Sequence, residues 1–206
     1  MRDPLKEAIT SEIDYNLLIY LLRHYKFPRN KISSLIASGS LVRVKKGLYV
    51  RGDAPYSLPV LANMVYGPSY VSQHYALGMY GLIPERVHAV TCMTLGRRKQ
   101  FDTPVGVFSY EPLPARLYSV GIRRVELSPT QPYQIATPEK AIVDIIWRRK
   151  DLNSTEAMDD YLTHDLRLDL DRRHVYSLSR MRKIESVYHK RCVKVLTTLL
   201  AKRLGS

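Results

Sequence analysis

The stretch that decides the fold runs from Tyr15 to Gly52 and reads YNLLIYLLRHYKFPRNKISSLIASGSLVRVKKGLYVRG. It contains no Asp or Glu, although acids stand at both of its borders, as Asp14 and Asp53. Eight basic residues lie within it: Arg23, Lys26, Arg29, Lys31, Arg43, Lys45, Lys46 and Arg51. Basic residues at this density, with no acid to neutralise them, favour a polyanionic ligand over a merely solvated face.

The order of elements within this stretch predicts a winged helix-turn-helix. Residues 15–22 are apolar with helical spacing, and a shorter helix follows, which Pro28 opens and Gly39 closes. Residues 41–50 then alternate between apolar and polar positions, which predicts two strands that turn at Lys46-Gly47. Together with a short helix from Pro4 to Thr10, this pattern predicts a DNA-binding domain over residues 1–53.

The shorter helix is expected to present small and polar side chains to solvent. Ile32, Leu35 and Ile36 recur at i, i+3 and i+4, so they share the buried face. The residues expected to contact DNA from this helix are Arg29, Asn30, Lys31, Ser33 and Ser34. Small side chains let a helix approach base edges, and an Asn can form two hydrogen bonds to adenine. Asn30 is therefore expected to contribute to sequence readout.

In the hairpin, the alternation assigns one face to the core and the other to the ligand. Val42, Val44 and Leu48 are expected to point inward. The cations expected to contact phosphates or a minor groove are Arg43, Lys45 and Lys46. The sequence thus predicts a helix and a basic loop that contact the same duplex.

The totals fit a globular protein with an anionic partner. The chain has 206 residues, of which 45% are hydrophobic, and a formal net charge of +13. This charge indicates nucleic acid, an anionic membrane surface or an acidic protein. Neither a membrane span nor a signal segment is recognisable, so we expect a cytoplasmic protein with no membrane partner. Cys92 and Cys192 are expected to be buried thiols, although the sequence leaves a disulfide between them open.

Residues 54–206 are expected to form a second domain, so that the fold class of the whole chain is α+β. The first domain ends at Gly52–Pro55, and Ser57 and Ser72 can cap helices that reach about Tyr66 and Tyr80. The period then changes to two, which predicts a mainly antiparallel sheet. Its expected strands are Val87–Leu95, Arg98–Phe101, Gly106–Tyr110, Val120–Leu127 and Tyr133–Ala136.

Helices are expected to complete the second domain. Thr137 and Pro138 are typical of a helix start, and further helices are expected at about residues 154–164, 170–180 and 184–203. Between Arg172 and Arg203, ten basic residues face a single acid, Glu185. An RNA-binding module that uses these basic helices is therefore an alternative hypothesis.

The sequence shows no set of residues typical of an enzyme. It has no phosphate-binding glycine loop, no zinc-protease motif and no nucleophile elbow, and its six His show no ligand spacing. Asp102, Glu111 and Glu126 lie on or near expected strands, so a metal-dependent or degenerate nuclease is a second alternative. We predict a non-enzymatic protein without catalytic residues, metal or cofactor.

Four stretches combine into a pattern that extends over most of the chain. They are Arg43–Tyr49, Tyr70–Leu77 with Tyr80–Glu85, Phe101–Tyr110 and Ile135–Asp144. Together they resemble the AbiEi-type antitoxins, predicted transcriptional regulators of abortive-infection (phage-defence) operons in type IV toxin–antitoxin systems. The resemblance covers roughly residues 12–165 and is weakest in the C-terminal helices.

The resemblance implies a protein with two activities. In such antitoxins a winged helix-turn-helix binds inverted repeats in the promoter of its own operon and represses it. A C-terminal domain counteracts a nucleotidyltransferase-like toxin, AbiEii. The implied partners are therefore double-stranded operator DNA and a cognate AbiEii-like toxin. Carried over to this chain, the resemblance implies that Arg29–Ser34 and Arg43–Arg51 contact DNA, which adds Tyr49 and Arg51 to the candidate residues.

Overall fold

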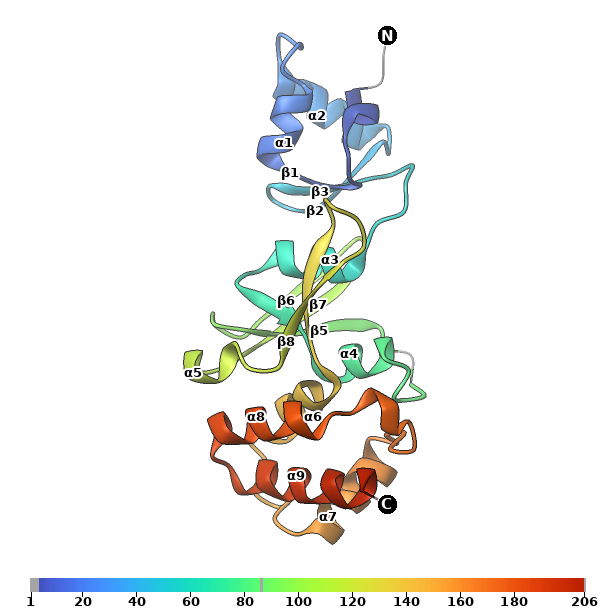
Figure 1. The fold of residues 1–206 in the computed structure, drawn as a ribbon. Helices are drawn as coiled ribbons and strands as arrows, with labels where there is room; N and C mark the ends of the chain where they lie inside the picture. The colour runs from blue at the N-terminus through green and yellow to red at the C-terminus, as the bar shows by residue number, and fades with distance from the viewer. Residues whose placement is uncertain (1–3, 86, 206) are drawn as a thin grey trace.

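The structure is a computed structural model that describes residues 4–85 and 87–205. Figure 1 shows the N-terminal elements at one end, a larger sheet in the middle and the C-terminal helices at the other end. These described residues form an α+β fold with two sheets, which confirms the predicted fold class. No helix in them is both long and apolar enough to cross a membrane.

The first sheet and two helices form what we call the N-terminal module, residues 4–53. Its elements are the 3-10 helix η1 (Pro4–Glu7), β1 (Glu12–Asp14), α1 (Tyr15–Leu21), α2 (Pro28–Ala37), β2 (Leu41–Lys45) and β3 (Leu48–Arg51). The strands are antiparallel in the order β1-β3-β2. The expected helix over Pro4–Thr10 is thus only a 3-10 turn that ends at Glu7, and strand β1 was not predicted.

The helices of this module form where capping and apolar spacing favour them. Asp14 caps α1 by accepting a hydrogen bond from the Leu17 N–H at 2.8 Å. Pro28 occupies the first turn of α2, whose buried residues are Ile32 and Leu35. These side chains enter a small core made of Leu5, Ile13, Leu18, Leu21, Leu22, Ile32, Leu35, Leu41 and Tyr49. The helices therefore pack against one face of the three-stranded sheet.

The rest of the chain, which we call the body, is built on a six-stranded sheet in the order β6-β7-β5-β4-β9-β8. Its strands are β4 (Ser69–Val71), β5 (Ala89–Thr94), β6 (Lys99–Thr103), β7 (Gly106–Pro112), β8 (Ile122–Glu126) and β9 (Pro132–Ala136). The pairs β4–β5, β6–β7 and β8–β9 are antiparallel, whereas β5–β7 and β4–β9 are parallel. Three of the five neighbouring pairs are antiparallel, so the sheet is mainly antiparallel, as predicted, but it also contains two parallel pairs.

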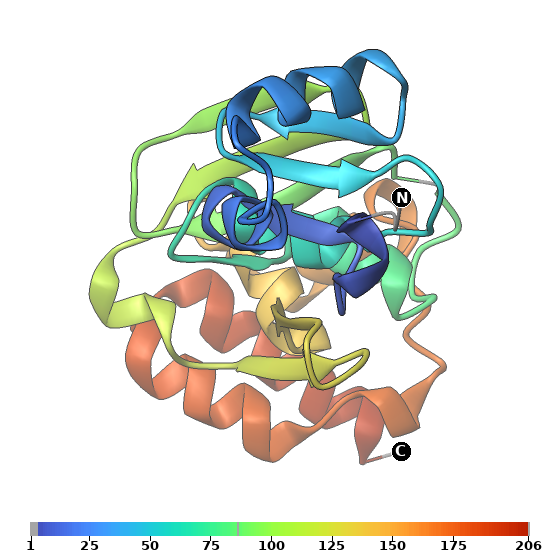
Figure 2. The ribbon, with the colours of Figure 1, turned by 90° about the horizontal axis from the view of Figure 1, so that it is seen from above.

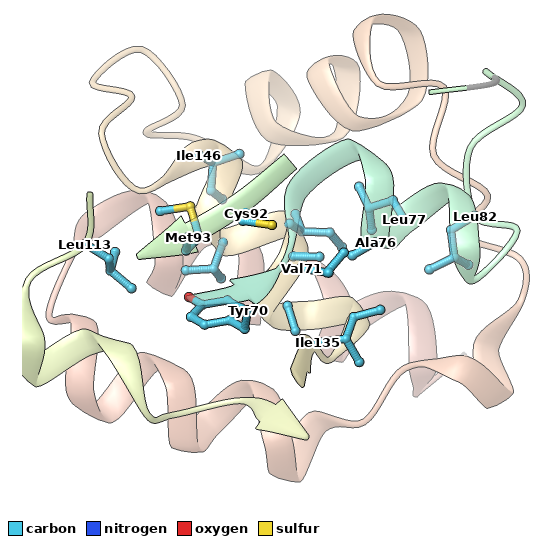
Figure 3. Close-up of a cluster of buried hydrophobic side chains, with 14 of the residues drawn as sticks. Tyr70, Val71, Ala76, Leu77, Leu82, Cys92, Met93, Leu113, Ile135 and Ile146 are labelled. Atoms are coloured by element: carbon cyan, nitrogen blue, oxygen red, sulfur yellow. The ribbon is translucent and has the colours of Figure 1, made fainter. Parts of the chain in front are cut away.

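Helices cover the sheet and enclose one large core. They are α3 (Leu58–Val65), α4 (Gln73–Met79), α5 (Ala115–Tyr118), α6 (Pro138–Ile146), α7 (Thr155–Asp160), the π-helix η2 (Tyr161–Asp165), the 3-10 helix η3 (Arg173–Val175), α8 (Leu178–Tyr188) and α9 (Arg191–Leu204). Figure 3 shows Tyr70, Val71, Met93 and Ile135 of the sheet beside side chains of α4 and α6. Cys92 lies in this core, and both cysteines are buried free thiols.

The three predicted helix starts in the body are present, although Ser72 precedes α4 without capping it and donates its hydroxyl to Asp144 instead. Ser57 caps α3, and Thr137 caps α6. The last helices are shifted along the chain. The expected helices over residues 170–180 and 184–203 are instead α8 and α9, which meet at His189. His189 adopts φ 48°, a left-handed conformation in which a helix commonly ends. Glycine is the usual marker of such an end, so a His gives no comparable signal.

The N-terminal module rests on helix α3 of the body. The Glu12 carboxylate accepts a hydrogen bond from the N–H of Ser57 at 2.5 Å, and the Lys45 ammonium donates to the carbonyl of Val65. An acid therefore lies at the first turn of α3 and a base at its end, which suits the helix dipole. Figure 2, seen from above, shows the blue and cyan module lying over the green strands. Val44, Leu48 and Val50 extend the large core into this contact.

Candidate nucleic-acid interface

The outward face of α2 is open to solvent. Arg29, Asn30, Ser33 and Ser34 are all exposed. The apolar spacing of this helix predicts exposure for Asn30, Ser33 and Ser34, whereas it places Arg29 near the buried edge, from which a long side chain can reach solvent. The Ser33 hydroxyl donates to the carbonyl of Arg29 at 3.3 Å, so it lies close to the helix backbone. Asn30 forms no hydrogen bond within the described residues through its side chain, which leaves its amide available to a ligand.

Lys31 lies at the edge of this face and is half-buried. Its ammonium is 5.3 Å from the centre of the Tyr25 ring. A cation over an aromatic face is attracted by the ring. Lys31 is therefore held beside the exposed helix face.

The hairpin places Arg43 and Lys46 at the surface. Lys46 is exposed at the turn, where Gly47 adopts φ +84°, a conformation that favours glycine. Arg43 pairs in register with Tyr49, and its guanidinium carbon is 5.8 Å from the centre of that ring. Because Tyr49 belongs to the core under α1 and α2, Arg43 lies on the same side of the sheet as the helices. Arg43 and helix α2 thus lie on one side of the three-stranded sheet.

Two predicted residues of the hairpin point elsewhere, and both predictions are corrected. Tyr49 is 4% exposed, so its side chain supports Arg43 from within the core and cannot reach a duplex. Lys45 points to the body, because a bulge between Arg43 and Lys45 breaks the strand alternation. Its ammonium donates to Val65 and lies 6.0 Å from the centre of the Phe101 ring. Burial, and then the charge of Lys99, lower the pKa of Lys45.

Arg51 is engaged by a neighbouring acid. Its Nε and Nη2 atoms donate to the two carboxylate oxygens of Asp53 at 3.0 and 2.9 Å. This hydrogen bonding lowers the pKa of Asp53, which therefore stays ionised. A guanidinium held in this way is a weaker candidate for a phosphate contact than the sequence predicted.

The remaining cations of the surface have no carboxylate partner. No ion pair among residues 4–85 and 87–205 includes Arg29, Lys31, Arg43 or Lys46. In the body, by contrast, opposite charges form ion pairs, such as Arg98 with Glu111 at 2.6 Å. The positive potential of the N-terminal surface is therefore left for an external anion.

The structure adds an aromatic groove that the sequence-based prediction missed. Phe27 is 62% exposed, directly before α2. It lines a groove of about 440 Å³ together with Tyr15, Ile19, Lys26, Pro28, Arg29 and Asn30. The Lys26 ammonium lies 5.5 Å from the centre of the Phe27 ring. Lys26-Phe27 next to the helix-opening Pro28 is the local signal that could have identified this groove.

A second basic surface lies at the opposite end of the molecule, where α8 meets α9. An open concavity of about 570 Å³ is lined there by Arg182, Glu185, Ser186, His189, Lys190, Arg191 and Lys194. Its charge agrees with the basic C-terminal stretch seen in the sequence. It is wide and has one acid among its cations, so its geometry does not select a particular kind of ligand.

The three carboxylates of the nuclease alternative are not brought together. Asp102 lies on β6 and Glu126 on β8, which are the two opposite edges of the sheet. Glu111 on β7 and Glu126 each pair with an arginine. No group of three or more His, Cys, Asp or Glu in the described part of the chain could hold a metal ion.

The motif around Lys140 and Asp144 forms a buried polar network. Lys140 donates to Asp144 at 2.8 Å and to the hydroxyl of Tyr188. Asp144 also accepts hydrogen bonds from Tyr70 at 2.8 Å and from Ser72 at 2.7 Å. All five side chains are inaccessible to solvent or nearly so. The network joins α6 to β4 and α8, and we assign it a structural role because every ionised group in it has partners.

No protein-family model and no curated protein matches this chain.

Proposed function

We propose that the protein is a sequence-specific DNA-binding regulator, in which α2 acts as the recognition helix and the β2–β3 hairpin as the wing of a winged helix-turn-helix. The observation that carries this proposal is the exposed surface formed by the acid-free stretch of residues 15–52. Asn30 and Ser34 are exposed on α2, while Arg43 and Lys46 are exposed on the hairpin, and the body covers none of them. This combination supplies a slim polar helix for base edges and cations for phosphates.

The decisive experiment is binding to the DNA upstream of the protein's own gene. Contacts to about six phosphates give a slope of log affinity against log salt near −5, so we expect a steep loss of affinity with salt. Fluorescence anisotropy with a labelled duplex, repeated from low to high salt and with an unrelated duplex as competitor, measures both the slope and the specificity. Equal affinity for both duplexes would reject a sequence-specific regulator.

Asn30 tests which helix reads the bases. Asn30→Ala should relax the preference at one base position by about 1–3 kcal/mol, because a bidentate contact to a base is lost. Binding to a library of single-base operator variants measures this preference. Ser38→Ala, at the end of the same helix, is the control and should leave every base preference unchanged. An identical preference profile for Asn30→Ala and wild type would move the recognition surface away from α2.

The regulator is further proposed to be an antitoxin of the AbiEi type that counteracts a nucleotidyltransferase-like toxin in the cytoplasm. This part of the proposal is supported by the family resemblance of the sequence. Co-expression with the product of the adjacent gene should restore growth that this product alone inhibits. An adjacent gene that does not inhibit growth would remove the antitoxin half and leave the regulator.

A further inference from the structure

A basic turn of the body, residues 95–99, leads from β5 into β6. Its three cations, Arg97, Arg98 and Lys99, are all exposed. Arg98 pairs with Glu111 at 2.6 Å, whereas no ion pair among residues 4–85 and 87–205 includes Arg97 or Lys99. Asp102, further along β6, points to the opposite face of the strand from Lys99, because successive side chains alternate between the two faces. The basic turn thus presents two exposed cations without an acid partner.

Tyr66, the residue after α3, holds the basic turn in place. Its hydroxyl accepts a hydrogen bond from the Arg97 N–H at 3.1 Å, and its ring centre is 4.8 Å from the Lys99 ammonium. Gly96 allows this close approach, because a Cβ at that position would collide with the Tyr66 hydroxyl. Both unpaired cations therefore project from a turn that is packed against the end of α3.

The same end of α3 also holds the wing hairpin. Lys45 donates to the carbonyl of Val65, the residue before Tyr66, and its ammonium is 6.0 Å from the centre of the Phe101 ring. The ring centres of Phe101 and Tyr66 are themselves 6.0 Å apart. Lys45 and Lys99 thus lie over two neighbouring rings, which agrees with the lowering of the Lys45 pKa by burial and then by the charge of Lys99. The basic turn is therefore a direct neighbour of the β2–β3 hairpin.

The turn of this hairpin is in contact with the start of α2. The N–H of Tyr15 donates to the carbonyl of Gly47, the residue after Lys46, at 2.9 Å. Tyr15 also lines the aromatic groove together with Arg29 and Asn30. The start of α2, the hairpin turn and the basic turn are therefore consecutive neighbours along the surface of the molecule.

We propose that the basic turn extends the DNA-binding surface onto the body, with Arg97 and Lys99 contacting phosphates next to the one that Lys46 contacts. The inference rests on the proposed DNA binding and adds the body to the surface that the duplex contacts. Phosphates attract cations whatever the base sequence, so these contacts contribute affinity and salt dependence but no base preference. They also determine how the duplex is oriented relative to the body.

The test compares the salt dependence of DNA binding in full-length double variants, by fluorescence anisotropy with the upstream duplex. Arg97→Gln with Lys99→Gln removes both proposed phosphate contacts, so the slope of log affinity against log salt should become shallower by about 2. Between about 50 and 200 mM salt, the affinity of the wild type should then fall about tenfold more than that of the variant. Arg173→Gln with Lys183→Gln is the matched control, because it removes one Arg and one Lys from exposed positions in the C-terminal helices. The control has the same net charge as the first variant and should keep the wild-type slope.

The outcomes distinguish this inference from the proposed function. Specific wild-type binding with an unchanged slope in the basic-turn variant would overturn the inference and leave the regulator. Equal affinity of the wild type for the upstream and the unrelated duplex would reject the sequence-specific regulator, while the slopes would still report whether the basic turn contacts DNA. A shallower slope in the control alone would place the duplex on the C-terminal helices and overturn the inference.

A charge-conserving variant separates lost charge from a disturbed turn. The Gln substitutions keep the backbone N–H of residue 97 that Tyr66 accepts, so the melting temperature should stay close to that of the wild type. Arg97→Lys with Lys99→Arg keeps both charges and should bind with the wild-type slope. A slope as shallow as that of the Gln variant would show that the shape of the turn matters and not its charge, which would overturn the phosphate contacts.

Discussion

The N-terminal module and the body use charged side chains in opposite ways. In the body, Lys140, Asp144 and Glu139 are buried, and each is surrounded by hydrogen-bond partners. In the module, Arg29, Arg43 and Lys46 are exposed and meet no carboxylate among the described residues. Charges in the first group hold elements together, whereas charges in the second remain available to an external partner. Exposure and the presence of a carboxylate partner therefore distinguish structural cations from candidate binding cations. The number of basic residues in a stretch of sequence does not make this distinction.

The largest effect is expected where a buried charge loses its partner. Asp144→Asn should lower the free energy of unfolding by about 3–5 kcal/mol, because Lys140 then remains buried without a counter-ion. Urea unfolding followed by circular dichroism measures this loss. Asp165→Asn removes an exposed carboxylate and should change the stability by less than about 0.5 kcal/mol. Equal, small effects of the two variants would show that the buried network is not the structural centre of the body.

The pH dependence of the same variant sharpens this prediction. Burial lowers the pKa of Lys140 and Asp144 raises it, so the Asp144→Asn variant retains only the lowering effect. Between this lowered pKa and the usual value of 10.5, the unfolded chain binds more protons than the folded one. The stability of the variant should therefore rise as pH increases in that range. Unfolding at pH 7 and pH 9 measures the trend, and a falling stability would contradict it.

A medium effect is expected at Glu12, where the two regions meet. Glu12 is 2% exposed and accepts the N–H of Ser57, the capping residue of α3, much as Glu139 accepts the N–H of Ser177 before α8. Glu12→Ala leaves buried donors without an acceptor and should cost about 1–3 kcal/mol. The exposed Glu7 supplies the control variant, Glu7→Ala. A two-step unfolding curve for Glu12→Ala would show in addition that the module and body then unfold separately.

The parts of the fold that were predicted are those with a local chemical cause. Pro28, Ser57 and Thr137 each determine a helix start through backbone geometry or capping, and all three starts are present. The parts that were missed depend on contacts between distant segments. The three-residue strands β1 and β4 exist only because neighbouring strands pair with them. No local pattern can report such a contact.

The candidate site, like the fold, was predicted only where the local sequence determines the structure. Exposure on α2 follows from the helical period, so Asn30, Ser33 and Ser34 lie where they were expected. In the hairpin, strict alternation assigned Lys45 to the outward surface together with Arg43, and Lys46 was expected at the turn. The bulge before Lys45 arises from the register with β3 and turns its side chain to the body. The charge of each lysine can be read from the sequence, but the direction in which its side chain points cannot.

The smallest effect, and the most direct comparison, is expected from these two adjacent lysines. They carry the same charge one residue apart, but Lys46 is exposed at the turn and Lys45 donates to Val65 in the body. Lys46→Ala should reduce the salt slope of DNA binding by about 1, because one phosphate contact is lost. Lys45→Ala should leave the slope unchanged and lower the free energy of unfolding by about 0.5–1.5 kcal/mol, since a carbonyl loses its donor. Anisotropy over a salt series and urea unfolding of both variants give the four values. If Lys45→Ala changes the slope and Lys46→Ala does not, the assignment of binding and structural cations is reversed, and the duplex must approach the module from the side of the body.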